Sequence, residues 1–190
     1  YSNGGFFTSP AKASANFSLT TYDSLIKKYH KMYFTDDKTL PTAIKTAITP
    51  LLLKCQMLKE SNGNPNAISP AGACGLFQIL NGAAQDIKGP GAIARNYMNP
   101  PEVNIDIGIQ YMKRLSKQIY NSCSGAAITS DDLAKETLLA YDHGIGNVTR
   151  YIKTAKLRHL TPNYLQIEQL LLDSRISAAS KKEASEYAPT

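Results

Sequence analysis

The stretch ESNGNPNAISPAGACGLFQI, residues 60–79, interrupts a chain whose other segments have helical patterns. Between Asn62 and Gly75 it contains three glycines, two prolines and three asparagines, which are residues that favour turns. A long loop inside a compact domain is usually either functional or disordered. This segment is therefore the first candidate for a functional loop.

The helix before this loop is predicted over residues 50–61, because Pro50 suits a first helical position and Thr49 is placed to cap it. The apolar residues at helical spacing predict its buried face: Leu51, Leu52, Cys55 and Leu58. Glu60 falls in the last turn, where the helix dipole disfavours a carboxylate and raises its pKa. A carboxyl group that stays protonated near neutral pH suits general-acid cleavage of glycosides, whereas the alternative is an exposed residue at a frayed helix end.

The rest of the chain predicts a mainly α fold, with no alternating strand of useful length. Besides 50–61, helices are expected near 24–33, after Pro41, over 102–120, from 130, over 147–157, and from 161 with Leu165, Leu170, Leu171 and Ile176 apolar. Residues 1–20 are expected to be a flexible arm, 21–180 the folded domain and 181–190 a tail.

Composition limits the classes of protein to consider. With 190 residues, 43% of them hydrophobic, the chain can build one core, and its net charge of +6 favours polyanionic partners. Its apolar runs are too short to span a bilayer. The start at Tyr1 suggests a processed product or a piece of a longer protein or assembly. Cys55, Cys74 and Cys123 lack zinc-ligand spacing, and one disulfide among them is left open.

Three blocks in register resemble the soluble lytic transglycosylase family, relatives of goose-type lysozyme. The resemblance covers roughly residues 42–151, and the blocks are 60–79, the helix at 104–115 with its glycine at Gly108, and Ala-Tyr-Asp-His-Gly-Ile-Gly-Asn-Val at 140–148. It implies a lysozyme-like helical domain with a groove for the glycan strands of peptidoglycan.

The resemblance also implies the chemistry. Glu60 would be the single catalytic acid and base, protonating the oxygen between N-acetylmuramic acid (MurNAc) and N-acetylglucosamine (GlcNAc). It would then deprotonate the muramyl 6-hydroxyl, which closes on C1 to leave a 1,6-anhydro end. The acetamido group of the substrate can stabilise the cationic carbon, so a second carboxylate is not needed, and neither a cofactor nor a metal is expected.

Besides Glu60, six residues are expected at the substrate, namely Ser61, Phe77, Gln78, Tyr141, Asp142 and His143. Gln78 would hydrogen-bond it, and Phe77, where the family usually has Met, would form an apolar wall beside Glu60. Tyr141 matches the tyrosine whose hydroxyl reaches the catalytic glutamate. Ser61 is expected to orient the catalytic turn.

Asp142 and His143 depart from the family's usual Asn and Ala. Asp142 either takes over the asparagine's hydrogen bond to backbone at the turn, or lies close enough to Glu60 to hold a water and favour hydrolysis. His143 is expected to line the groove or the surface. A hydrolytic muramidase is therefore one alternative function, and a non-catalytic peptidoglycan-binding module of a virion or secretion machine is another.

Basic residues are concentrated late in the chain, where 150–190 has seven Lys or Arg and four Asp or Glu. Arg150, Lys153, Lys156 and Arg158 have no acid among them. Attraction to the anionic wall is the favoured interpretation and an ordinary solvated surface is the alternative, whereas no motif for nucleic-acid recognition accompanies the charge. The resemblance places the site of action in the periplasm, the cell wall or a virion.

Overall fold

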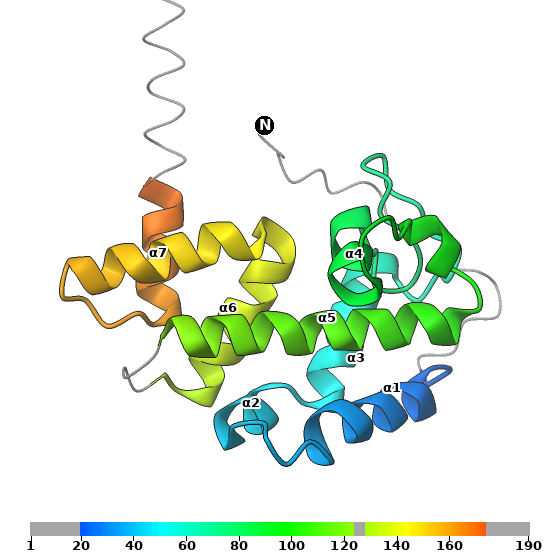
Figure 1. Cartoon of the computed structure of the whole chain (residues 1–190), viewed down its shortest axis with the longest axis horizontal. Helices are drawn as coiled ribbons and strands as arrows, with labels where there is room; N and C mark the ends of the chain where they lie inside the picture. Colours follow the sequence, from blue (N-terminus) through cyan, green and yellow to red (C-terminus); the bar gives the residue numbers. More distant parts are fainter. Residues whose placement is uncertain (1–19, 124–127, 174–190) are drawn as a thin grey trace, which may run out of the picture. The chain divides into compact units, whose positions relative to one another are not determined.

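The computed structural model describes residues 20–123 and 128–173, and these are mainly helical (Figure 1). The predicted fold class is thereby confirmed. The chain divides into two compact units, with residues 20–41 and 48–114 in the first and 42–47, 115–123 and 128–173 in the second. Apart from Thr20, the predicted arm at 1–20 and tail at 181–190 lie outside the described residues.

The first unit is built around α3, with α1 packed against it. Its elements are α1 (Asp23–His30), the π-helical turn η1 (Lys31–Thr35), α3 (Pro50–Ser61), α4 (Asn81–Lys88), the 3-10 turn η2 (Ala94–Tyr97) and the first part of α5 (Pro101–Ser122). Its core contains fully buried side chains from each of the longer segments, among them Ile26, Phe34, Leu53, Met57, Leu76, Phe77, Ile105 and Ile109. The isoleucines Ile105 and Ile109 thus anchor α5 in this core.

Helix α3 begins as predicted but buries a different face. The side chain of Thr49 accepts a hydrogen bond from the backbone N–H of Leu52 at 3.1 Å, which caps the helix. The predicted buried face was wrong, since Leu51 is 69% exposed and Cys55 is exposed. The buried residues are Leu53, Gln56, Met57 and Ser61.

The error has a physical reason. Three consecutive leucines place apolar side chains on several sides of the helix, so spacing alone does not select one. On the observed face, Glu60 follows Gln56 and Met57 by four and three residues, which are neighbouring positions on a helix surface. Glu60 therefore lies beside the buried face and is itself half-buried.

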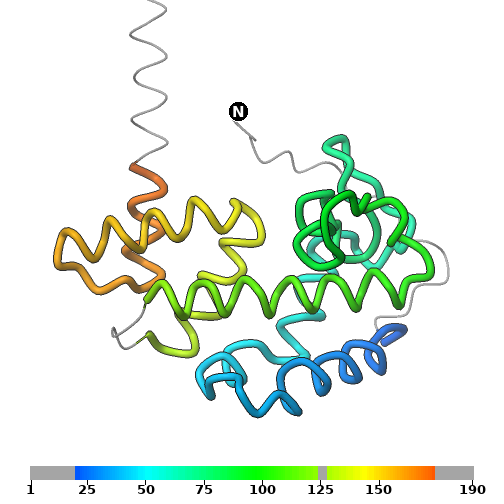
Figure 2. Tube along the Cα trace, viewed as in Figure 1, coloured from blue at the N-terminus to red at the C-terminus, as the bar shows by residue number. Residues whose placement is uncertain are grey.

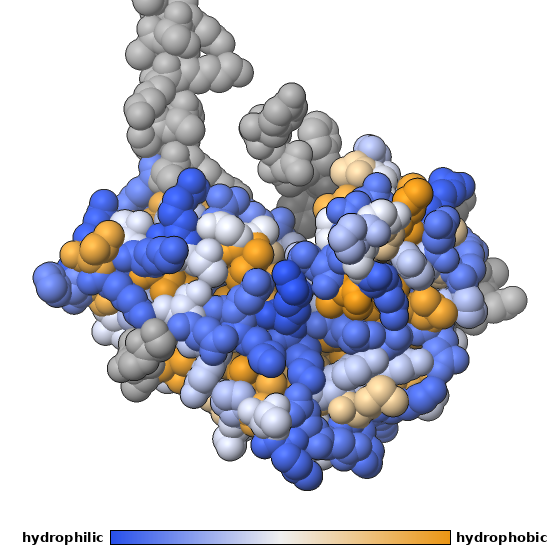
Figure 3. Space-filling model, in the orientation of Figure 1, coloured by the Kyte–Doolittle hydropathy of each residue, from blue (hydrophilic) through white to orange (hydrophobic). Residues whose placement is uncertain are grey.

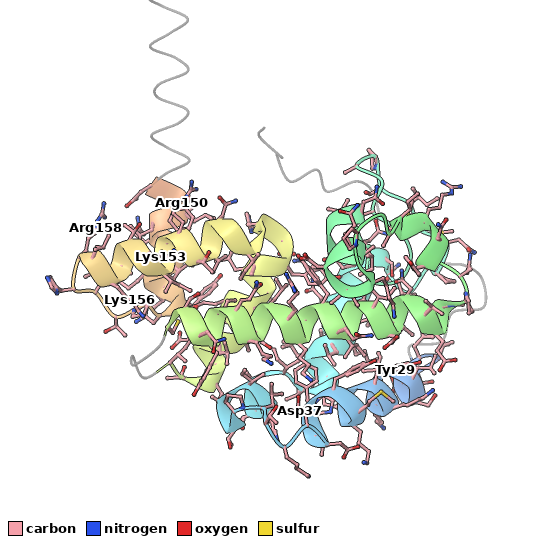
Figure 4. All side chains as sticks on the ribbon, viewed as in Figure 1. Tyr29, Asp37, Arg150, Lys153, Lys156 and Arg158 are labelled. Atoms are coloured by element: carbon pink, nitrogen blue, oxygen red, sulfur yellow. The ribbon has the colours of Figure 1, made fainter. Side chains whose placement is uncertain are left out.

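Side-chain bonds connect the segment 29–37 to α5 within the first unit. The hydroxyl of Tyr29 donates to Glu102 Oε1 at 2.9 Å, and Lys113 Nζ lies 2.7 Å from Asp37 Oδ2 (Figure 4). The hydrogen bond from Lys113 holds the pKa of Asp37 well below its usual range. These contacts fix the first helix against α5 from the solvent side.

The second unit packs α6 against both α2 and α7. Its elements are α2 (Thr42–Ala47), the last part of α5, α6 (Ser130–His143), α7 (Ile145–Leu157) and a helical segment over 164–173. Its fully buried side chains include Ile44, Leu115, Ile119, Leu133, Val148, Ile152 and Ile167. Thr129 caps α6 by accepting from the N–H of Asp132 at 3.0 Å, one residue before the predicted start.

The helical segment at 164–173 begins later than the sequence suggested. Asn163 Oδ1 accepts from the N–H of Gln166 at 3.0 Å, so Asn163 rather than Thr161 caps it. Leu165, predicted to be apolar core, is 71% exposed, whereas Leu170 and Leu171 are buried as predicted. Ile176 lies outside the described residues.

All three cysteines are free, so the disulfide left open by the sequence is not formed in this structure. Cys123 is buried in the second unit, where its sulfur lies 4.0 Å from Glu136 Oε2. The other oxygen, Glu136 Oε1, is buried without a hydrogen-bond partner among the described residues. Burial, followed by the nearby charge of Asp132, raises the pKa of Glu136 to about 8. Glu136 therefore keeps its proton at neutral pH.

Because Glu136 is buried in its protonated form, we expect the free energy of unfolding to fall as the pH rises. Unfolding returns the pKa of Glu136 towards 4.5, so between pH 4.5 and 8 the folded state alone holds the proton. Relative to wild type, Glu136→Gln should leave the free energy of unfolding unchanged at pH 4.5 and raise it by roughly 3 to 5 kcal/mol at pH 8. Urea unfolding at both pH values measures this, and an equal difference at both would contradict it.

Candidate functional site

Glu60 lies in the last turn of α3, with its carboxylate held by a neighbour on the same helix. Gln56 Nε2 donates a hydrogen bond to Glu60 Oε1 at 2.7 Å, and Gln56 is only 2% exposed. A bond between a buried amide and a half-buried carboxylate is short and charge-assisted. The carboxyl group is thus fixed in orientation at the point where the helix ends.

The chain leaves α3 through a tight left-handed turn. Asn62 has a φ of 50° and its N–H bonds to the carbonyl of Leu58 at 2.7 Å, which ends the helix. Ser61 is buried, and its hydroxyl donates to the carbonyl of Met57 at 3.1 Å. Ser61 is therefore engaged with its own helix directly beside Glu60.

The loop over 62–79 folds on itself through its own hydrogen bonds, and Figure 2 traces it between α3 and α4. Cys74 and Ile79 exchange two backbone bonds, at 3.0 and 2.9 Å. Gln78 has a φ of 44°, and its Nε2 donates to the carbonyls of Ala67 at 3.1 Å and Gly75 at 2.9 Å. The amide nitrogen of Gln78 thus connects two segments of the loop, at Ala67 and at Gly75.

The buried side chain of Asn104 on α5 connects the loop to the core. Its Oδ1 accepts from the N–H of Phe77 at 2.8 Å, and its Nδ2 donates to the carbonyls of Cys74 at 3.1 Å and Tyr97 at 3.3 Å. Asn104 is 0% exposed, so these bonds satisfy backbone groups that water does not reach. One side chain thereby fixes both the loop and the segment before α5.

Two glycines allow this close packing. A side chain at Gly75, whose φ is +77°, would place its Cβ 2.5 Å from Asn104 Nδ2. A Cβ at Gly108, one turn after Asn104, would overlap the ring of Phe77. The fully buried Phe77 ring therefore lies directly on the backbone of α5.

The second motif segment lies in the second unit, at the end of α6. Tyr141 and His143 are half-buried and Asp142 is exposed. The ring of His143 is 3.3 Å from the carbonyl of Leu139, and Asn147 Nδ2 donates to the carbonyl of His143 at 2.8 Å. Asn147 thus provides a side-chain bond to the backbone where α6 ends.

The expected site residues therefore fall into two groups, which are Glu60, Ser61, Phe77 and Gln78 in the first unit and Tyr141, Asp142 and His143 in the second. The burial of Ser61 and Phe77 favours a supporting role for these two side chains. Sequence reasoning missed Gln56 and the function of Asn104. The i, i+4 spacing between Gln56 and Glu60 was the available signal for the first.

Other features of the described residues do not coincide with these groups. A cavity of about 350 Å³ lies by the first turn of α3, at the opposite end from Glu60, with Ile26, Leu51 and Lys54 in its lining. Residues 20–123 and 128–173 contain no cluster of three or more His, Cys, Asp or Glu that could hold a metal ion. In the same ranges, no helix has the length and apolar character needed to cross a membrane.

The geometry thus defines a helical domain with a held carboxylate at a helix end, followed by a rigid loop. Residues 42–160 match the family described as Transglycosylase SLT domain, and the chain belongs to this family.

Among curated relatives, the membrane-bound lytic murein transglycosylase C of Sodalis glossinidius is 36% identical over 104 residues, which cover 52% of this chain and 28% of the relative. The Edwardsiella ictaluri protein of the same name is 30% identical over 137 residues, covering 70% of this chain and 36% of the relative. The soluble lytic murein transglycosylase of Escherichia coli K12 is 32% identical over 105 residues, covering 53% and 14%. The chain thus spans about a third or less of the length of these relatives.

The role of Asn104 predicts a large effect of a small substitution. Asn104→Ala removes the bond to the buried N–H of Phe77 and one of the two bonds to the buried carbonyl of Cys74, which should lower the free energy of unfolding by about 3 kcal/mol. Asn121→Ala, at an exposed position of the same helix, is the matched control and should change it by less than about 0.5 kcal/mol. Chemical denaturation measures both, and similar values for the two variants would refute this role of Asn104.

Proposed function

We propose that this chain is a peptidoglycan lytic transglycosylase that cleaves the β-1,4 bond between MurNAc and GlcNAc. The observation that supports it most is the half-buried Glu60 carboxylate, held by buried Gln56 at the start of the family's loop. Membership of the SLT family and similarity to proteins named lytic murein transglycosylases support the same activity.

In the first step Glu60 acts as the general acid. Its proton passes to the glycosidic oxygen, the bond from that oxygen to C1 of MurNAc breaks, and GlcNAc leaves as an alcohol. As positive charge develops at C1, the carbonyl oxygen of the substrate's own 2-acetamido group bonds to C1 and forms an oxazolinium ion. This assistance makes one protein carboxylate sufficient, unlike the usual glycosidase pair.

In the second step the same carboxylate acts as the base. Glu60 takes the proton of the MurNAc 6-hydroxyl, O6 attacks C1, and the bond from C1 to the acetamido oxygen breaks. The product is 1,6-anhydro-MurNAc, and Glu60 is again protonated. Water is neither consumed nor released, so no cofactor or activated solvent molecule is needed.

The bond from Gln56 sets the orientation of the Glu60 carboxyl group. Gln56 Nε2 donates to Oε1, so this oxygen is engaged as an acceptor and the plane of the carboxyl group is fixed. Gln56 is a positioning residue that acts through Glu60.

The remaining motif residues are proposed to bind or support the glycan. Gln78 uses its amide nitrogen within the loop, so it offers Oε1 as an acceptor to a hydroxyl or amide N–H of the sugar. Ser61 and Phe77 support the loop from inside. As the family resemblance implies, Tyr141 assists Glu60. Asp142 and His143, which depart from the family, are proposed to lie at the substrate, Asp142 either bonding backbone at the turn or holding a water near Glu60.

The proposed substrate also sets the place of action. Murein lies outside the cytoplasmic membrane, so the domain would act in the periplasm, in the wall or from a virion. The small share of each relative that the chain covers fits a catalytic domain of a larger protein or assembly.

Replacing the catalytic acid tests the proposal. Glu60→Gln removes the exchangeable proton and should lower clearing of purified peptidoglycan by roughly 1,000-fold in zymograms and turbidity assays. Lys59→Gln, the exposed neighbour, should clear like wild type. Equal clearing by wild type and Glu60→Gln would exclude Glu60 from catalysis, and no clearing by either would indicate a binding module.

The positioning role of Gln56 predicts a smaller loss. Gln56→Met keeps the size of the side chain but removes the donor to Glu60, and turnover should fall roughly 10- to 100-fold. Cys55→Ala, on the exposed side of the same helix, is the control and should retain full turnover. Initial rates on peptidoglycan, with melting temperatures to confirm folding, measure the effect. Unchanged turnover in folded Gln56→Met would refute the proposed orientation of the carboxyl group.

A further inference from the structure

The outer surface of α7 carries cations that lack a carboxylate partner. Arg150, Lys153 and Arg158 are exposed along this helix and its end, and we call them the α7 basic face (Figure 4). None of the three forms an ion pair within the part of the chain that the structure describes. Residues 143–167 contain neither Asp nor Glu. Among the described residues, the positive charge of this face is therefore not compensated by an ion pair.

In the first unit, by contrast, several basic side chains lie beside a carboxylate. A carboxylate lies within 4.0 Å of each of several basic side chains there, namely Lys28, Lys31, Lys54, Lys88, Lys113 and Arg114. Uncompensated charge raises the local potential and attracts anions, whereas paired charge does so much less. The α7 basic face is thus a candidate surface for an anionic partner.

Lys156 does not belong to this face, although the sequence grouped it with the other three. Its Nζ donates to the carbonyl of Ser122 at 2.7 Å, at the last residue of α5. A cation there satisfies a terminal carbonyl and interacts favourably with the helix dipole. Lys156 accordingly has a structural function within the second unit.

Arg150 is held in place and connected to the second motif segment. Its Nη2 donates to Asn147 Oδ1 at 3.0 Å, and Asn147 Nδ2 donates to the carbonyl of His143 at 2.8 Å. The guanidinium also lies over the ring of Tyr151, 5.3 Å from its centroid. The basic face thus starts in the second turn of α7, is linked through Asn147 to the end of α6, and is partly preorganised.

The composition of the surface decides which anion fits. The apolar side chains of α7 are buried in the core of the second unit, as Val148, Tyr151, Ile152 and Ala155 show. Leu157 is 83% exposed at the end of the helix, but Figure 3 shows apolar residues only in small groups there. The helix therefore has no free apolar face to insert into lipid, and its buried tyrosine ring is not available to stack on a base.

We infer that the α7 basic face binds the carboxylates of the peptide stems that the glycan strand of peptidoglycan carries. Arg150 and Lys153 lie three residues apart on one helix surface, so a guanidinium and an ammonium can engage neighbouring carboxylates. This inference rests on the proposed function. It adds that residues of α7, in the second unit, recognise the stems of the substrate.

Binding to two forms of one glycan tests the inference. Purified strands with intact stems, and the same strands after removal of the stems with an amidase, are titrated against Glu60→Gln, which binds without turnover. Adding Arg150→Glu and Lys153→Glu to this variant should weaken binding to stem-bearing strands about tenfold at low salt. Binding to stem-free strands should change by less than twofold. A matched control adds Lys27→Glu and Lys38→Glu, two exposed cations of the first unit, and should leave both affinities unchanged.

Several results would overturn the inference. These are an equal loss on stem-free strands, an equal loss in the Lys27 and Lys38 control, or unchanged binding to stem-bearing strands by the folded Arg150 and Lys153 variant. Loss of binding to phosphatidylglycerol vesicles without loss of stem binding would identify a membrane surface as the partner instead. A last measurement separates this inference from the proposed function. The Arg150→Glu, Lys153→Glu variant with Glu60 intact should still cleave stem-free glycan, because that turnover depends on Glu60 and not on stem recognition.

Discussion

The amide of Asn104 occupies a buried position from which it bonds to three backbone groups outside its own helix. The first part of the loop is rich in glycine, proline and asparagine, whereas its second part buries Leu76, Phe77 and Ile79, so its conformation depends on directed bonds as well as on apolar packing. Because the same helix turn approaches the loop so closely, Gly75 and Gly108 are needed beside it. Asn104 is therefore the side chain of α5 that anchors the loop following Glu60 to the core.

This constraint explains how a sequence that favours turns can form a precise site. The helix end places Glu60, buried Gln56 sets the orientation of its carboxyl group, and the loop is held by Asn104 and by the amide of Gln78. None of these bonds involves an exposed, freely rotating side chain pair. A general acid that must later act as a base benefits from such fixed geometry, since the same carboxyl group has to serve both steps.

Much of this architecture could be predicted from the sequence, and the failures have physical causes. The long periodic helix α5 and the caps near Thr49 and Ser130 were foreseen, because period and capping residues are local signals. The buried face of α3 was not, because consecutive leucines satisfy several faces at once. The prediction for Leu165 was also wrong, because an apolar residue near the start of a helix can remain exposed. The bonds of Asn104 connect residues far apart in sequence, so local patterns do not reveal them.

The distribution of charge shows the same difference between sequence and structure. Four cations of the α7 region look equivalent in the sequence, yet one of them binds a helix end and three face solvent. The central claim, however, is the fate of the glycosidic bond. Digestion of peptidoglycan in water enriched in heavy oxygen tests it most directly by mass spectrometry of the products. The account predicts 1,6-anhydro ends that contain no heavy oxygen, whereas one heavy oxygen per cleaved bond would show hydrolysis and contradict it.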